Sequence, residues 1–222
     1  MLSSFNLSLE EKNDIFSKGT VCVINIPNSW PILNVIQKFE NDTVYFKMSE
    51  DLLKLNVLEG FNITFQILKG PYEYIAESKI SKITTSTPCL VEAPVQYLSQ
   101  FENNRKHKRY FITCHGMINL PNSDESVFCI SKNISNSGVF LLTKNKLPVG
   151  GSVKLTISFP SSISNKGNVE FKASVIRCII KENHNEYGLN ISEIDDENGK
   201  ELTYIANKLD ENLNFFVDEY LK

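Results

Sequence analysis

The chain has 222 residues, of which 41% are hydrophobic and 22% charged, and its formal net charge is -3 at pH 7. The apolar share excludes a disordered chain. The mild acidity argues against a protein that binds a nucleic acid polymer over a broad basic surface.

The chain carries no sign of membrane insertion or export. No run approaches the ~18 consecutive apolar residues of a membrane-spanning helix, and the first residues lack the basic and apolar regions of a secretory signal. The five cysteines include no CxxC pair, which favours free thiols in a reducing compartment. We therefore expect a cytoplasmic protein.

The first half is predicted to be a short helix followed by strands. Ser8 and Glu11 stand at the spacing of a capping box, and Gly19 is suited to end the segment. Runs rich in β-favouring residues, separated by Gly60 and Gly70-Pro71, then predict strands at 43–48, 62–68, 72–80 and 89–92.

A polar segment separates this series from a second one. Residues 94–109 begin with a proline and end in a basic cluster, which indicates a domain boundary. Strands are predicted beyond it at 109–118, 127–132, 138–143, 152–159, 169–180 and 187–192. Short strands at this spacing are typical of a barrel or a sandwich.

The last segment has the pattern of an amphipathic helix. Apolar residues recur at steps of three and four from about Asp195 to Leu221, including Leu202, Ile205 and Leu209. Acidic residues at its start favour a helix N-terminus.

The basic cluster at 105–109, with the sequence RKHKR, has three open interpretations: a solvated linker, a nucleic acid patch or a small-ligand site. Arg105 and Arg109 are four residues apart. Their Cα atoms would be ~13 Å apart in an extended chain and ~6 Å apart in one helical turn. The planar fork of arginine fits phosphate oxygens or the O6/N7 edge of guanine.

The segment 133–138, with the sequence NISNSG, lies between two predicted strands. It can be a simple turn, because Asn, Ser and Gly favour turns. It can also present the Asn133 amide, the Ser135 hydroxyl and a close backbone approach at Gly138 to a ligand.

Together the two segments resemble the PilZ domain, the bacterial receptor for cyclic di-GMP. Arg105 and Arg109 match its RxxxR motif, and Asn133, Ser135 and Gly138 match its [DN]xSxxG motif with Asn in first place. The resemblance continues through 148–150, 175–177 and 187–190, and covers about residues 99–222. The β-rich half before it resembles the N-terminal domain of the YcgR-like flagellar brakes.

This resemblance implies a mainly β protein of two antiparallel barrels, a YcgR-like split barrel at 1–98 and a PilZ barrel at 99–222, with a C-terminal amphipathic helix. The ligand-binding switch segment would be 99–109, mobile without ligand and ordered with it. Cyclic di-GMP would contact Arg105, Arg109, Asn133, Ser135 and Gly138, with secondary contacts from Asn104, Lys106 and Arg177. A surface salt bridge is the alternative role for Arg177.

The implied function is that of a cyclic di-GMP effector which changes its domain arrangement and acts on a protein partner, such as a flagellar motor or stator component. The alternative is a PilZ-fold adaptor that binds no nucleotide. We expect no enzyme, cofactor or metal site, because there is no nucleophile motif and His107, His115 and His184 lack metal-ligand spacing.

Overall fold

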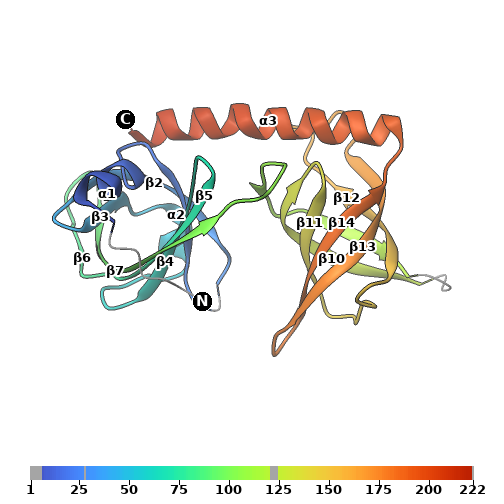
Figure 1. Cartoon of the computed structure of the whole chain (residues 1–222), viewed down its shortest axis with the longest axis horizontal. Helices are drawn as coiled ribbons and strands as arrows, with labels where there is room; N and C mark the ends of the chain where they lie inside the picture. The colour runs from blue at the N-terminus through green and yellow to red at the C-terminus, as the bar shows by residue number, and fades with distance from the viewer. Residues whose placement is uncertain (1–6, 28, 121–124, 222) are drawn as a thin grey trace. The chain divides into compact units, whose positions relative to one another are not determined.

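The computed structural model describes residues 7–27, 29–120 and 125–221. The chain divides into two compact units, one running up to Asn104 and including the end of the chain from Asn214, the other spanning Arg105–Leu213. Each unit is built on an antiparallel barrel (Figure 1). The prediction of two antiparallel barrels with a C-terminal helix is therefore confirmed.

The N-terminal barrel is a ring of six strands in the order β3-β2-β1-β4-β5-β7, counted over the described residues, and pairing of β3 with β7 closes it. Two short helices, α1 (Leu9–Ile15) and α2 (Glu50–Lys54), accompany it. The strands are β1 (Val21–Asn25), β2 (Ile32–Glu40), β3 (Thr43–Lys47), β4 (Asn62–Lys69), β5 (Tyr72–Lys79), β6 (Lys82–Ile83), which adds to β7, and β7 (Leu90–Glu102).

Helix α1 begins at the predicted capping box. The Ser8 backbone N–H donates to Glu11 Oε2 at 2.7 Å, and the Glu11 N–H donates to Ser8 Oγ at 3.2 Å. Two amides at the helix start are thereby satisfied. The helix ends earlier than predicted, at Ile15, because Ile15 and Phe16 turn into the barrel core, where both are buried.

Hydrophobic alternation explains which strands the sequence predicts. Ile63, Phe65 and Ile67 are buried along β4 while their neighbours are more exposed, and this strand is confirmed. The pattern does not predict β1, because residues 22–24 are all buried and no alternation is left to detect. It also misses β2, where residues 34–36 are buried in succession.

Strand β7 continues through the segment predicted to be a polar boundary. Its first part pairs with β3 as far as Pro94, and its second part pairs with β5 from Val95 to Glu102. Ladder bonds from β5 hold this polar sequence in a strand although much of it is exposed. The expected boundary between residues 98 and 99 thus falls inside β7, and the exact domain limits stay a prediction.

The C-terminal barrel is a ring of six strands in the order β11-β14-β13-β12-β9-β10, again over the described residues, and pairing of β10 with β11 closes it. Strand β8 adds to β10. The elements are β8 (Tyr110–Phe111), β9 (His115–Asn119), β10 (Ser126–Ser135), β11 (Gly138–Thr143), β12 (Ser152–Ser158), β13 (Asn168–Ile180), β14 (Asn185–Glu193) and α3 (Asp196–Leu221).

The single strand predicted at 109–118 is broken into β8 and β9. At the break, the Cys114 N–H donates to Ser131 Oγ at 3.0 Å, and this hydroxyl donates to the Ile112 carbonyl at 2.9 Å. The Ser131 side chain therefore supplements the backbone bond from the Ser131 N–H to the Cys114 carbonyl, at 2.8 Å, where the two strands are interrupted. Both strands pair with β10, so the break brings β8 over the end of the β10–β11 hairpin.

Helix α3 confirms the predicted amphipathic helix, and its first turns pack on the C-terminal barrel. Leu202 and Ile205 are buried in the barrel core. Glu201 lies beside them and is only 6% exposed. Its Oε1 accepts hydrogen bonds from Ser164 Oγ at 2.8 Å and from the N–H groups of Asn165 and Lys166 at 2.7 and 3.3 Å.

These contacts set the ionisation of Glu201. Burial opposes the charged form, but the three hydrogen bonds outweigh it and hold the pKa of Glu201 below its ordinary value of 4.5. The carboxylate therefore fastens α3 to the loop at 160–167 most strongly when it is ionised.

We expect Glu201→Gln to lower the free energy of unfolding by about 1 kcal/mol at pH 7, because the three hydrogen bonds then end on a neutral amide oxygen, and bonds to a charged acceptor are the stronger ones. The folded-state pKa is depressed, so this contribution is complete above the ordinary pKa of 4.5 and disappears as the pH falls through the folded-state value. Denaturant unfolding of both proteins at pH 7 and near pH 3.5 measures the difference.

Glu182→Gln, at an exposed position, is the matched control and should leave stability unchanged at both pH values. A gap between wild type and Glu201→Gln that stays the same at low pH would contradict the role of the charge.

Candidate functional site

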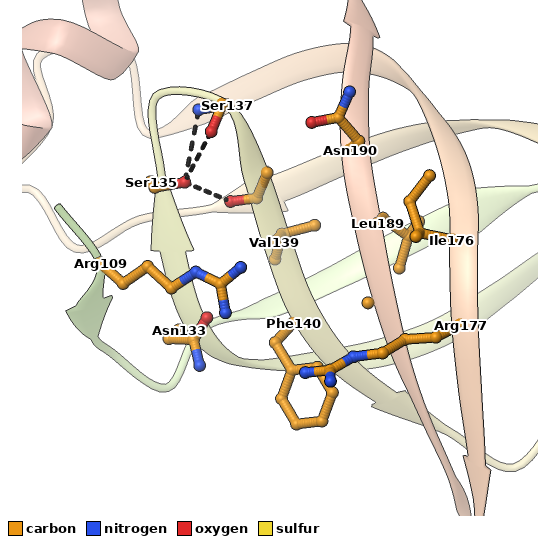
Figure 2. Close-up of a pocket in the computed structure, with 12 residues that line it drawn as sticks. Arg109, Asn133, Ser135, Ser137, Val139, Phe140, Ile176, Arg177, Leu189 and Asn190 are labelled. Carbon is orange, nitrogen blue, oxygen red and sulfur yellow. Dashed lines mark hydrogen bonds between the residues drawn. The ribbon is translucent and has the colours of Figure 1, made fainter. Parts of the chain in front are cut away.

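The tip of the β10–β11 hairpin carries the NISNSG segment. Ser135 pairs with Gly138, so two residues form the turn. Ser135 is buried, and its hydroxyl accepts from the Ser137 N–H and donates to the Gly138 carbonyl, both at 3.3 Å (Figure 2). The serine therefore shapes the turn itself, alongside any contact with a ligand.

Gly138 is required by the neighbouring strand. It lies opposite Asn190 in the β11–β14 ladder, and a Cβ atom at this position would stand 2.5 Å from the Leu189 carbonyl oxygen. Any side chain would force β14 away from β11. The sequence suggested that a ligand could approach the backbone closely at Gly138; in the structure, the backbone of β14 makes a close approach there.

Strand β8 places Arg109 beside this hairpin. Tyr110 pairs with Ile134 and Phe111 with Asn133, so Arg109 is level with Ser135 in the continued register. Its side chain is half-buried. Figure 2 shows its guanidinium extending over the hairpin toward Asn133.

A second arginine approaches from the opposite side. The register of β13 shifts between Val175 and Arg177, and such a bulge redirects the side chains that follow. Arg177 extends across Gly188 to the ring of Phe140, with its guanidinium carbon 5.4 Å from the ring centroid (Figure 2). A Cβ atom on Gly188 would come within 3.0 Å of Arg177, so the absence of a side chain at Gly188 leaves room for the Arg177 side chain.

The two arginines border a surface cavity of about 370 Å³. It also contains two amide side chains, one face of an aromatic ring and several aliphatic groups. Its lining residues are Arg109, Asn133, Ser135, Ser137, Gly138, Val139, Phe140, Ile176, Arg177, Gly188, Leu189 and Asn190. Such a volume is within the range of small-molecule sites.

This lining suits a ligand that is planar in part and negatively charged in part. Guanidinium groups form bidentate hydrogen bonds to phosphate oxygens and to purine edges, and they stack on flat rings. The amides of Asn133 and Asn190 supply both donors and acceptors.

The cavity contains some of the predicted site residues and not others. Arg109, Asn133, Ser135, Gly138 and Arg177 line it. Asn104, Arg105 and Lys106 do not; they are exposed in the bend that connects β7 to β8. That bend is irregular, so neither the extended strand nor the helical turn considered for RxxxR is formed.

The end of the basic cluster is joined to α3. Tyr110 donates from its hydroxyl to Asp210 Oδ2 at 2.7 Å, and Lys108 forms an ion pair with Asp210 Oδ1. Burial raises the pKa of Tyr110, and the bond to Asp210 raises it further. Burial opposes the charge of Asp210, but hydrogen bonds from Lys108 and Tyr110 keep its pKa below the ordinary value.

Sequence reasoning missed several lining residues. Phe140 and Ile176 look like ordinary strand residues, and Asn190 belongs to residues 187–190, which contribute to the resemblance without indicating a ligand contact. The signal that finds them is strand pairing: β11 lies between β10 and β14, so Phe140 and Asn190 share the surface next to Asn133.

The described ranges lack two further features. No group of three or more His, Cys, Asp or Glu side chains there could hold a metal ion. None of the helices in those ranges combines the length and the apolar character needed to span a bilayer.

Comparison with known proteins adds a family and a fold. The family model of the PilZ domain matches residues 103–207. Among curated proteins, none matches the sequence.

Several solved structures are similar in fold. MrkH of K. pneumonia in complex with c-di-GMP has 13% identity and a TM-score of 0.52, covering 93% of this chain and 94% of that one. YcgR of Escherichia coli in complex with c-di-GMP has 11% identity and a TM-score of 0.48, covering 95% of this chain and 92% of that one. The Bacillus subtilis inhibitor of motility (MotI/DgrA) has 16% identity and a TM-score of 0.44, covering 89% of this chain and 98% of that one.

The match to the family model falls on the barrel that carries the RxxxR and [DN]xSxxG segments, and the likeness to MrkH extends over both barrels. Residues 103–207 of this chain are therefore identified as a PilZ domain.

Proposed function

We propose that this chain is a receptor for cyclic di-GMP that performs no catalysis and passes the bound state to a protein partner. The observation that carries the proposal is the cavity of the PilZ domain, which brings Arg109 and Arg177 to either side of Phe140 and places Asn133 beside Arg109 (Figure 2). No sequence motif by itself produces this arrangement.

The chemistry of the ligand fits the cavity. Cyclic di-GMP carries two phosphodiester anions and two guanine rings, each with O6 and N7 as neighbouring acceptors. Arg109 is placed to hold a phosphate or a guanine edge, and Arg177, already stacked on Phe140, presents a flat cation to a second ring. Arg105 joins them when the exposed bend at 103–109 folds over the ligand.

The same bend supports a switch. It connects β7 to β8 and lies where the two units of the chain meet in sequence. Ligand that binds the ordered bend more tightly than the free one shifts the population toward it, and the altered junction changes the domain arrangement. Because the first half of the sequence resembles the flagellar brakes, the expected partner is a flagellar motor or stator component.

We expect Arg105→Ala and Arg109→Ala each to weaken cyclic di-GMP binding about 30-fold or more, because each removes a charge-assisted contact of ~2–5 kcal/mol. Calorimetric titration gives the affinity and the stoichiometry. Lys106→Ala should have a smaller effect, because lysine lacks the planar fork.

Lys146→Ala removes the same charge at an exposed position outside the cavity lining and is the control. If an arginine variant folds normally yet binds within about threefold of wild type, the site assignment is wrong. If the wild type itself gives no binding, the alternative of a PilZ-fold adaptor is favoured.

We expect the site to prefer cyclic di-GMP over cyclic di-AMP by at least ~10-fold, since one bidentate arginine–guanine pair is worth ~1–3 kcal/mol of discrimination. Adenine replaces O6 with an amino donor, which would face an arginine N–H. Competition titration at fixed ionic strength measures the ratio. Equal affinities that both fall steeply with salt would show that the site recognises phosphates alone.

We expect saturating cyclic di-GMP to protect the amides of residues 103–109 from hydrogen exchange. Residues 99–102 supply an internal control, because they already lie in β7, where Glu102 pairs with Tyr72, and should change little. Unchanged exchange across 103–109 would remove the basis for a switch at this segment.

A further inference from the structure

The residues on either side of Arg109 share one partner on α3. Lys108 forms its ion pair with one carboxylate oxygen of Asp210, and the Tyr110 hydroxyl donates to the other at 2.7 Å. The Lys108 ammonium also lies 5.4 Å from the Tyr110 ring centroid. A single carboxylate thus holds two side chains of the chain segment that enters β8.

This shared partner determines which way Arg109 faces. Lys108 and Tyr110 both contact Asp210, so these two side chains lie on the same side of the chain. Because Asp210 draws Lys108 and Tyr110 toward α3, Arg109 is directed to the opposite side, where it lines the cavity with Asn133 and Ser135. The pairing of Tyr110 with Ile134 fixes the height of Arg109 along the hairpin.

The anchor is itself held firmly. Asp210 follows Ile205 and Leu209 on α3; Ile205 is fully buried in the core of the C-terminal barrel and Leu209 packs against it. Asp210, Lys108 and Tyr110 all belong to the same compact unit as the cavity. Asp210 therefore keeps its place on the barrel when the bend at 103–109 moves.

We propose that Asp210 is a positioning residue for ligand binding: through Lys108 and Tyr110 it holds Arg109 in the orientation that contacts cyclic di-GMP. This inference rests on the proposed function for its ligand, while the structural anchor can be tested without ligand. It also gives Lys108 a role inside the domain rather than on the ligand.

The first experiment uses the free, full-length protein. Asp210→Ala removes both acceptor oxygens while favouring the helix, and amide exchange at 105–111 should become faster. Glu211→Ala is the matched control, because the neighbouring Glu211 forms its ion pair along the same helix, with Lys208 at 2.7 Å. Unchanged exchange in Asp210→Ala would overturn the anchor.

The second experiment is a double-mutant cycle on cyclic di-GMP affinity. Asp210→Ala should weaken binding about tenfold, as expected if Arg109 adopts the competent orientation a tenth of the time. Asp210→Glu, which keeps the carboxylate, should restore part of the affinity. In an Arg109→Ala background, Asp210→Ala should cause no further loss.

An equal loss in both backgrounds would show that Asp210 supports the domain in general, and would overturn its action through Arg109. Failure of the wild type to bind cyclic di-GMP would instead overturn the proposed function, and the exchange result in free protein would then decide whether the anchor exists.

Discussion

The close approach of β11 to β14 at Gly138 is the constraint on which the PilZ domain depends. With the Leu189 carbonyl 2.5 Å from the place of a Cβ atom, only glycine lets the two strands pair at this point. Strand β11 also pairs with β10, and this pairing closes the barrel. The same glycine therefore serves both the ring of strands and the hairpin tip beside the cavity.

The cavity is a product of strand register. Arg109 reaches it because β8 pairs with the end of β10, and Arg177 reaches it because β13 is bulged and Gly188 leaves room for its side chain. Phe140 lies between them on β11. Two arginines far apart in sequence thus line one cavity, and the Arg177 guanidinium lies over the Phe140 ring, where a cation and an aromatic face attract each other.

The charges of the basic segment are divided among three positions: an ion pair with α3, the exposed bend and the cavity. Lys108 is bound to Asp210, and its charge is balanced within the domain. Arg105 and Lys106 remain on the exposed bend, and Arg109 is directed to the cavity. This division leaves a small group of cations near the cavity rather than a broad basic surface.

The residue pattern alone predicted most strands and the helices α1 and α3, because alternation, caps and turn residues are local signals. The choice of two barrels and the selection of Arg109, Asn133, Ser135, Gly138 and Arg177 as site residues came from the resemblance to the PilZ domain. The residue pattern did not predict strands β1 and β2, because their consecutive buried residues show no alternation. It predicted only the first part of β7, because hydrogen bonds to β5 rather than apolar residues hold the second part in a strand. It took the folded chain to show that Phe140, Ile176 and Asn190 line the same cavity and that Asp210 contacts the side chains on either side of Arg109. Those neighbours are set by strand register, a bulge and helix packing, and each of these depends on contacts between residues distant in sequence.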